Sequence, residues 1–176
     1  MKRILLAVSS LMIVIPNAHA KSAFETYGDI GAIAIPALAA SYAWQQDDQE
    51  GLKQFGYSLA STTATVEGLK YSIDSTRPNG KSHSFPSGHT ALAFSGASYL
   101  QMRYGWEYGA PAYIAAGAVG WSRVSSNNHY WRDVFAGALI ASGFSYLFTT
   151  PKDQKIAFYP LLMDNNTTGI GMHLVY

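Results

Sequence analysis

The histidines and arginines of this 176-residue sequence are concentrated in a few short segments. Of the four histidines and four arginines that follow residue 20, five fall within 70–78, 85–90 and 122–133. Only 13% of the residues are charged, and a chain that places its cations in three patches beside apolar stretches is typical of one that builds a single polar site. Imidazole and guanidinium groups together would suit the binding of an anion with several oxygens, with proton transfer and nucleophilic attack at its centre.

The first segment carries two cations, Lys70 and Arg77, seven residues apart. On one continuous helix they would share a face and lie about 10.5 Å apart along the axis. Such a pair suits a multi-oxygen anion, because arginine offers a planar fork and lysine a point charge. The alternative is an ordinary surface ion pair between Lys70 and Asp74, four residues apart.

The second segment places Ser87, Gly88 and His89 just before an apolar stretch. Ser87 or a neighbour is predicted to cap a helix there, and Gly88 lets the backbone come close to a ligand. Since exposed N–H groups at a helix start bind phosphate, His89 would face the bound anion and donate a proton to its leaving oxygen. The alternative is a capped turn with an incidental histidine.

The third segment places His129 four residues before Asp133. One helical turn would bring the carboxylate against the imidazole, which fixes one ring nitrogen and leaves the other free to attack. Arg123, six residues before His129, supplies a third cation. The alternative is a histidine–aspartate pair on a solvated helix face.

Together the three segments resemble the type 2 phosphatidic acid phosphatase superfamily. The signature of that family has a lysine, six residues and Arg-Pro, then Pro-Ser-Gly-His, then Ser-Arg, five residues, a histidine, three residues and an aspartate. Here it reads Lys70…Arg77-Pro78, Pro86-Ser87-Gly88-His89 and Ser122-Arg123…His129…Asp133, with every spacing intact. The motifs cover 70–133 and leave the C-terminal segment unexplained.

The resemblance implies hydrolysis of phosphate monoesters or diphosphates without metal or cofactor. It implies that His129 is the nucleophile and forms a phosphohistidine, that Asp133 orients it, and that His89 protonates the leaving alkoxide. The phosphoryl oxygens would be held by Lys70, Arg77, Ser87, Gly88 and Arg123. This agrees with the chemistry, since phosphoryl transfer mainly needs positioning and stabilisation of charge on the equatorial oxygens. His83 and Arg132 lie outside the signature and are expected to be outside direct contact with the phosphate or on the surface.

The substrate is less determined. An exported member of this family would act on a phosphorylated envelope lipid, and aromatic residues around the third motif would line a groove for its acyl or prenyl chain. A broad-specificity soluble acid phosphatase is the competing enzyme. A vanadate-dependent haloperoxidase is disfavoured by the short chain, and a non-catalytic envelope protein by the intact set of motif residues.

Five apolar stretches are predicted to be the helices that position these motifs, at 29–46, 50–76, 89–104, 111–121 and 130–149. Two short runs, 156–163 and 169–176, predict a β-hairpin around Asp164-Asn165-Asn166. That hairpin is expected to lie against the helices, with a membrane-contacting edge as the alternative. The predicted fold class is therefore mainly α, a single helical bundle of the phosphatidic acid phosphatase/haloperoxidase type with a C-terminal hairpin tail over 155–176.

Residues 1–20 are predicted to be a signal peptide that is cleaved after Ala20. Lys2 and Arg3 precede an apolar run, and Ala18-His19-Ala20 has the small-x-small form that signal peptidase accepts. Residues 21–176 would then be a single exported phosphatase domain in a bacterial periplasm. It is expected to be soluble or in peripheral contact with a membrane, because the uninterrupted apolar runs within its helices, 30–44 and 134–148, are shorter than the ~20 residues of a membrane span. The alternative is an integral membrane bundle.

The composition excludes several other classes of protein. The 12 Lys+Arg nearly balance the 11 Asp+Glu, which gives no support for a nucleic-acid partner. The sequence has no cysteine, which removes disulfides, zinc-finger spacings and thiol nucleophiles. A phosphorylated lipid or a small phosphoester therefore remains the expected partner.

Overall fold

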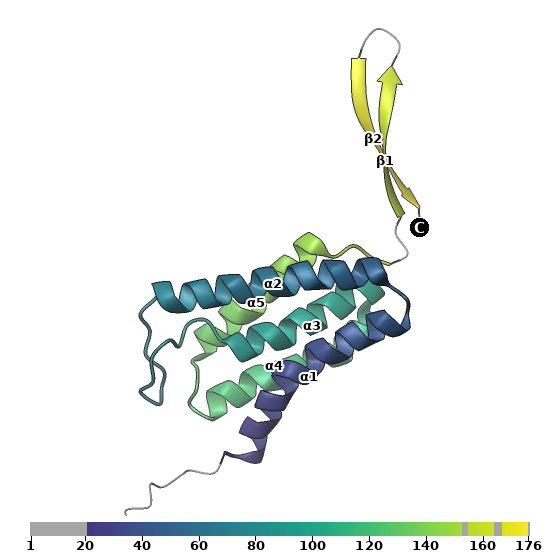
Figure 1. The fold of residues 1–176 in the computed structure, drawn as a ribbon. Helices are drawn as coiled ribbons and strands as arrows, with labels where there is room; N and C mark the ends of the chain where they lie inside the picture. Colours follow the sequence, from purple (N-terminus) through teal and green to yellow (C-terminus); the bar gives the residue numbers. More distant parts are fainter. Residues whose placement is uncertain (1–20, 153–154, 164–166, 176) are drawn as a thin grey trace, which may run out of the picture.

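The computed structural model describes residues 21–152, 155–163 and 167–175, and the predicted signal peptide lies outside these ranges. Five helices come first: α1 (Ala23–Gln45), α2 (Gln49–Ser72), α3 (Gly88–Tyr104), α4 (Trp106–Ser125) and α5 (Trp131–Phe148). Two strands follow, β1 (Lys155–Met163) and β2 (Thr167–Val175) (Figure 1). The predicted helical-bundle fold is confirmed. None of the helices described is both long and apolar enough to span a bilayer.

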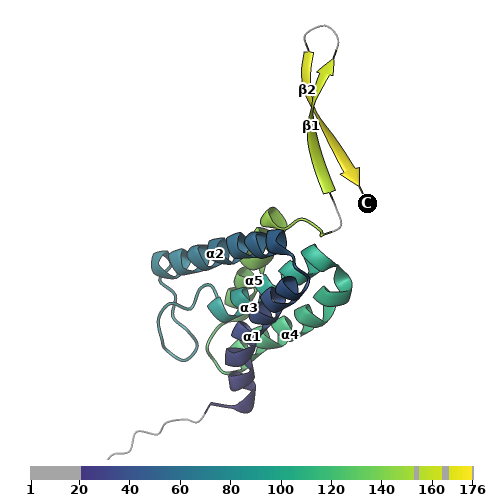
Figure 2. The ribbon, with the colours of Figure 1, turned by 45° about the vertical axis from the view of Figure 1, so that its right-hand side comes forward.

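Helix α3 lies at the centre of the bundle and packs against all four other helices (Figures 1 and 2). Its buried side chains are mostly small, among them Ala93 and Ala97, with Tyr99 as the largest. Small residues let the helices come close together: a Cβ added at Gly96 would lie 2.8 Å from the Pro36 backbone of α1. This close packing fixes both ends of α3 relative to its neighbours.

Helix α2 ends earlier than predicted, at Ser72 and not near residue 76. The chain beyond it pairs with itself. The N–H of Ser84 donates to the carbonyl of Ser75 at 2.8 Å, and the N–H of Arg77 donates to the carbonyl of Lys81 at 2.7 Å. These turn contacts satisfy backbone groups that a longer helix would have used, so residues 73–87 form a folded loop.

Two other helices start earlier than predicted. Helix α1 begins at residue 23 and not at 29, because the Ser22 hydroxyl caps it by accepting from the N–H of Glu25 at 3.0 Å. Helix α4 covers 106–125 and not 111–121. It starts directly after Gly105, whose positive φ of 91° ends α3 and separates the two helices. Pro111 lies in its second turn without ending it.

The end of the bundle where α1 and α3 finish is held by a buried ion pair. The guanidinium of Arg103 donates to both carboxylate oxygens of Asp48, at 2.6 and 2.7 Å, and the Tyr104 hydroxyl donates to the same carboxylate at 2.8 Å. Arg103 also donates to the carbonyl of Thr150 at 2.7 Å. The pair thus joins the α1–α2 corner, the end of α3 and the chain after α5.

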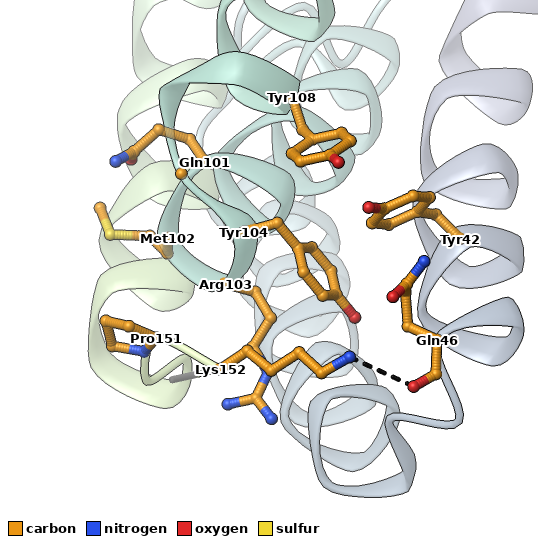
Figure 3. A pocket seen from close by; sticks show the side chains of 10 residues that line it. Tyr42, Gln46, Gln101, Met102, Arg103, Tyr104, Tyr108, Pro151 and Lys152 are labelled. Carbon is orange, nitrogen blue, oxygen red and sulfur yellow. Dashed lines mark hydrogen bonds between the residues drawn. The ribbon is translucent and has the colours of Figure 1, made fainter. Parts of the chain in front are cut away.

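A cavity of about 580 Å³ opens beside this ion pair (Figure 3). Figure 3 shows the aromatic rings of Tyr42, Tyr104 and Tyr108 around it, and Lys152 donates across it to the carbonyl of Gln46 at 3.2 Å. None of the residues that line it belongs to the three signature segments. It lies at the opposite end of α3 from the phosphate site predicted by the sequence.

Strands β1 and β2 form the antiparallel hairpin that the sequence predicts, with a register from Lys155↔Val175 to Met163↔Thr167. The structure describes the pairing of the two strands with each other, and the expectation that the hairpin lies against the helices stays a prediction.

Candidate active site

The three signature segments meet at the end of the bundle where α3 and α5 begin and α2 and α4 finish (Figure 1). The ammonium of Lys70 donates to the carbonyl of Pro86 at 2.8 Å, which joins the first segment to the second. The N–H of Ser87 donates to the carbonyl of Asp133 at 2.9 Å, which joins the second to the third. The approach is close, since a Cβ on Gly137 would lie 2.5 Å from the Ser87 carbonyl oxygen.

Arg77 is carried by the loop 73–87 and not by α2, so the prediction that it shares a helix face with Lys70 is wrong. The loop is fixed to the segment between α4 and α5. The N–H of Asn79 donates to the carbonyl of Asn127 at 3.1 Å, and its side-chain amide donates to Asn128 Oδ1 at 3.0 Å. Tertiary contacts, and not helical spacing, bring this guanidinium to the site.

His129 and Asp133 form a buried pair. His129 precedes α5 by two residues, so the two do not share a helical turn as predicted, yet Nδ1 of His129 lies 3.6 Å from Oδ2 of Asp133. Their side chains are only 3% and 0% exposed. Oδ2 of Asp133 also accepts from the Ser84 hydroxyl at 2.5 Å and from the Tyr130 N–H at 3.0 Å. The carboxylate is therefore held from three sides, with its charge towards the imidazole.

The imidazole of His129 is neutral near pH 7. Burial, followed by the positive charges of Arg77 and Lys70, lowers its pKa to about 4, although Asp133 and the backbone of Ser84 oppose the shift. A neutral ring keeps a lone pair, which nucleophilic attack requires. Because Nδ1 faces Asp133, Nε2 is the nitrogen available for that attack.

Lys70 and Arg77 each present cationic donors to the site. Lys70 is half-buried, and burial lowers its pKa, an effect that Glu67 opposes and Arg77 reinforces. Arg77 contacts the carbonyl of His83 at 3.5 Å, whereas its buried Nε has no hydrogen-bond partner among the residues described. Of the five N–H donors of a guanidinium, three on the two terminal nitrogens thus remain for an anion.

Ser87 caps α3, as predicted. Its hydroxyl accepts from the N–H of Thr90 at 3.4 Å and lies 2.9 Å from Oγ of that threonine, while its own N–H is held by Asp133. The side chain is fully buried. The hydroxyl of Ser87 is thus engaged in the cap, and its N–H joins α3 to α5. Gly88 and His89 follow in the first turn, where N–H groups have no acceptor within the helix.

Arg123 is buried at the end of α4 and is held largely by α1. Its guanidinium donates to Oδ1 of Asp29 at 2.6 Å, to the carbonyl of Glu25 at 2.5 Å and to the hydroxyl of Ser122 at 3.0 Å. A guanidinium has five N–H donors, so these three contacts leave two for a ligand. Arg123 is therefore paired with Asp29, and its contact with phosphate stays a prediction.

His89 lies at the open side of the site. Its Nε2 is 3.3 Å from Oδ1 of Asp29, and its side chain is 45% exposed. Burial, then Arg123, lowers its pKa, Asp29 opposes this, and Lys70 and Arg77 act in the same direction as Arg123. Lys70 and Arg77 thus lower the pKa values of both His89 and His129, so both imidazoles lie within electrostatic range of the same two cations.

The structure adds two residues that the sequence motifs did not reveal, Asp29 and Ser84. His83 and Arg132 are expected from the sequence to be outside direct contact with the phosphate or on the surface. His83 is exposed and contacts Ser82. The side chain of Arg132 is 67% exposed and lies 3.5 Å from Oδ1 of Asp133. Within 21–152 and the two strands, no three histidine, aspartate or glutamate side chains gather in a group that could hold a metal ion.

Comparison with known proteins agrees with this geometry. Residues 51–156 match the model of the PAP2 superfamily. The Helicobacter pylori protein "Lipid A 4'-phosphatase" is 30% identical over 149 residues, which cover 77% of this chain and 75% of the relative. The Porphyromonas gingivalis "Lipid A 1-phosphatase" is 41% identical over 87 residues, but these are 47% of this chain and only 19% of the relative.

The fold has a counterpart among solved structures. The crystal structure of Aquifex aeolicus LpxE superposes with a TM-score of 0.63 at 24% identity, covering 70% of this chain and 81% of that one. At this identity the likeness concerns the arrangement of the helices, and the family assignment depends on the sequence matches. With more than half of its residues matched by one family model and a relative that it covers over most of its length, the chain belongs to the PAP2 superfamily.

Proposed function

We propose that this protein is a metal-independent lipid phosphatase that cleaves a phosphate monoester or diphosphate through a phosphohistidine on His129. Membership of the superfamily, together with relatives named as lipid A phosphatases, supports a phosphoric ester hydrolase. The observation that carries the mechanism is the buried His129–Asp133 pair, in which a neutral imidazole stands between a carboxylate and two cations. That arrangement suits an attacking nitrogen that becomes positively charged as it bonds to phosphorus.

In the proposed reaction, Nε2 of His129 attacks phosphorus as the ester P–O bond breaks. His89 donates its proton to the departing oxygen, so the leaving group departs as an alcohol or, from a diphosphate, as a phosphate monoester. The neutral His89 then takes a proton from water, which attacks the phosphohistidine, breaks the P–N bond and releases phosphate. Asp133 offsets the charge on His129 while the intermediate exists. Both rings return to their starting states.

The cations would hold the phosphoryl oxygens during both steps. Lys70 and Arg77 approach from α2 and the loop after it, and Arg123 contributes its two remaining N–H groups from α4. The N–H groups of Gly88 and His89 add the positive end of the α3 dipole. Ser87 supports this end of α3 through the cap, and its hydroxyl, which accepts from the Thr90 N–H, stays a proposed donor to phosphate.

A lipid substrate is supported by the names of the two bacterial relatives, both lipid A phosphatases, and by exposed aromatic side chains near the site. Trp121 packs edge-on against Phe24 at 5.6 Å, and Trp131 lies 5.9 Å from Phe135. Both tryptophans are exposed. Tryptophan favours the interface between water and lipid, so we propose that this end of the bundle touches the membrane that presents the phosphate.

We further propose that the protein is exported to a bacterial periplasm after removal of residues 1–20. The support for this is the sequence pattern at Lys2, Arg3 and Ala18-His19-Ala20. The predicted cleavage after Ala20 would leave α1 whole, because that helix is capped by Ser22 and begins at Ala23.

The function can be tested by measuring phosphate release from purified 21–176 in EDTA across a panel of phosphoesters. We expect activity on lipid phosphates in vesicles or detergent, at a kcat/KM at least about tenfold above that on a water-soluble aryl phosphate, because the lipid adds binding at the aromatic surface. Equal rates on both classes would favour the soluble acid phosphatase. Activity that EDTA removes and Mg²⁺ restores would contradict the metal-independent mechanism.

The pH dependence of kcat/KM should be bell-shaped with its maximum on the acidic side. His129 must be neutral, so activity should fall as the pH drops through its pKa of about 4. His89 must be protonated to act as the acid, and its pKa is lowered by burial and by Arg123, so activity should also fall as the pH rises past a value below the ordinary histidine pKa. Rates from pH 3 to 9 would check both limbs, and a maximum above pH 7.5 would contradict the assignment.

A further inference from the structure

Helix α1 lies outside the part of the chain that matches the family model, yet it supplies a carboxylate to the site. Oδ1 of Asp29 accepts from Arg123 at 2.6 Å and lies 3.3 Å from Nε2 of His89. We infer that Asp29 is a positioning residue, whose carboxylate holds the imidazole of His89 and the guanidinium of Arg123 where the leaving oxygen and the phosphoryl group need them. This inference rests on the proposed function.

The surface of α1 is shaped for this contact. A Cβ on Gly28 would overlap both the Arg123 guanidinium and the Ser122 hydroxyl, so only glycine leaves room for the buried arginine there. One turn earlier, the carbonyl of Glu25 accepts from the same guanidinium at 2.5 Å. One turn of α1 thus accommodates Arg123 through the carbonyl of Glu25, the space left by the missing side chain of Gly28 and the carboxylate of Asp29. A chance surface ion pair would not need that space.

Asp29 is ionised at neutral pH. Burial would raise its pKa, but hydrogen bonds from Lys21 and Arg123 outweigh that effect and hold the pKa below its ordinary value. The Lys21 ammonium contacts Oδ2 at 2.6 Å, which leaves Oδ1 to be shared between Arg123 and His89. One carboxylate oxygen therefore fixes the relative position of a phosphate-binding cation and the predicted acid.

The carboxylate also sets the charge around His89. Cations face this ring from three elements: Lys70 of α2, Arg77 of the following loop and Arg123 of α4. Asp29 of α1 is the anion that opposes them, while α5 and the segment before it bring Asp133 and His129 together deeper in the site. Without Asp29, protonation of His89 would be opposed by three positive charges and favoured by none of these groups.

The two histidine–aspartate pairs have different environments that match different tasks. His129 and Asp133 are buried, which suits a nucleophile that must stay neutral and away from competing water. His89 and Asp29 are 45% and 28% exposed, which suits an acid that must exchange its proton with solvent in each cycle. The sequence motifs contain the first pair and only half of the second.

The test is Asp29→Asn, which keeps the size of the side chain and removes its charge. We expect kcat on a phosphoester that wild type cleaves to fall by about 10- to 100-fold, because an acid that is less often protonated and less well placed transfers its proton more slowly. The alkaline limb of the kcat profile should move to lower pH. NMR titration of the His89 ring, assigned with a His89→Asn variant, should show its pKa lowered.

Two further variants separate positioning from general stability. Asp29→Glu keeps the charge and should retain the alkaline limb of wild type while recovering only part of kcat. Asp47→Asn makes the same charge change on an exposed residue just beyond the other end of α1, at a positive φ that asparagine tolerates, and should behave as wild type. If wild type is active and Asp29→Asn changes neither the alkaline limb of the plot of kcat against pH nor the pKa of His89 measured by NMR, the inference is wrong and the proposed function stands. Wild type that cleaves nothing in the panel would reject the function, and the inference with it.

Discussion

His129→Ala should lower kcat by at least about 10⁴-fold, because the variant has no nitrogen to attack phosphorus and no route to a covalent intermediate. The fold should survive. The Nδ1 of His129 is buried without a hydrogen-bond partner, and the backbone N–H of residue 129, which alanine keeps, still donates to the carbonyl of Arg123 at 3.1 Å. Phosphate release and far-ultraviolet circular dichroism, measured on the same preparation, would show loss of turnover with unchanged helicity.

His83→Asn is the matched control for this variant. His83 is exposed, contacts Ser82 through its ring and has a φ of 58°, a conformation that asparagine adopts readily. It should retain the rate of wild type. A reaction with a substrate that carries a labelled phosphate can be quenched rapidly in alkali, in which phosphohistidine survives. Wild type and His83→Asn should then carry the label on the protein, and His129→Ala should not. A His129→Ala enzyme with more than about a hundredth of the wild-type rate would rule out His129 as the obligatory nucleophile.

Arg77→Ala should reduce kcat/KM by about 10²- to 10³-fold, with a small effect on stability. The loss follows from removing one cationic donor from a partly water-excluded phosphoryl site. Stability should change little, because the side-chain Nε has no partner among the described residues and the backbone of Arg77 still makes its turn contacts with Lys81 and Gly80. Steady-state kinetics and thermal denaturation of the variant would measure the two effects separately.

Lys81→Ala removes a cation from the same loop and serves as its control. Lys81 is exposed, and its contact with Arg77 is made by the backbone carbonyl, which alanine keeps. Its kcat/KM should be unchanged. Arg77→Lys should recover only part of the loss, because an ammonium keeps the charge but not the planar pair of donors. If Lys81→Ala and Arg77→Ala lost activity equally, the net positive charge of the loop would determine the rate, and a specific contact between Arg77 and phosphate would be ruled out.

The residues that sequence spacing identified are those whose partners lie close along the chain. His129 and Asp133, and Ser87 with the helix start that follows, depend on separations of four residues or fewer, so a motif of the right length already implies their contact. The same local reasoning failed for Arg77. It extended α2 through residue 76, whereas the loop closes on itself through Ser75 and Ser84.

Asp29 could not have been identified in this way. It is one of several acidic residues in the chain and its neighbours form no recognised motif. The two site residues that it contacts, His89 and Arg123, are 60 and 94 positions away. Ser84 likewise lies 49 positions from Asp133. Contacts of this length depend on how helices pack, and packing depends on the fit of many small side chains around α3 that no short pattern encodes.

The contact between Asp29 and Arg123 joins residues 94 positions apart, from the first helix to the fourth. Closing so long a loop costs entropy that is repaid only when both helices have docked on α3. During synthesis on a ribosome, Asp29 is made early, and Arg123 emerges only after most of the chain has been synthesised. During refolding from denaturant, the circular dichroism signal of the helices should therefore recover before phosphatase activity. Activity should return only when α1 has packed against the rest of the bundle.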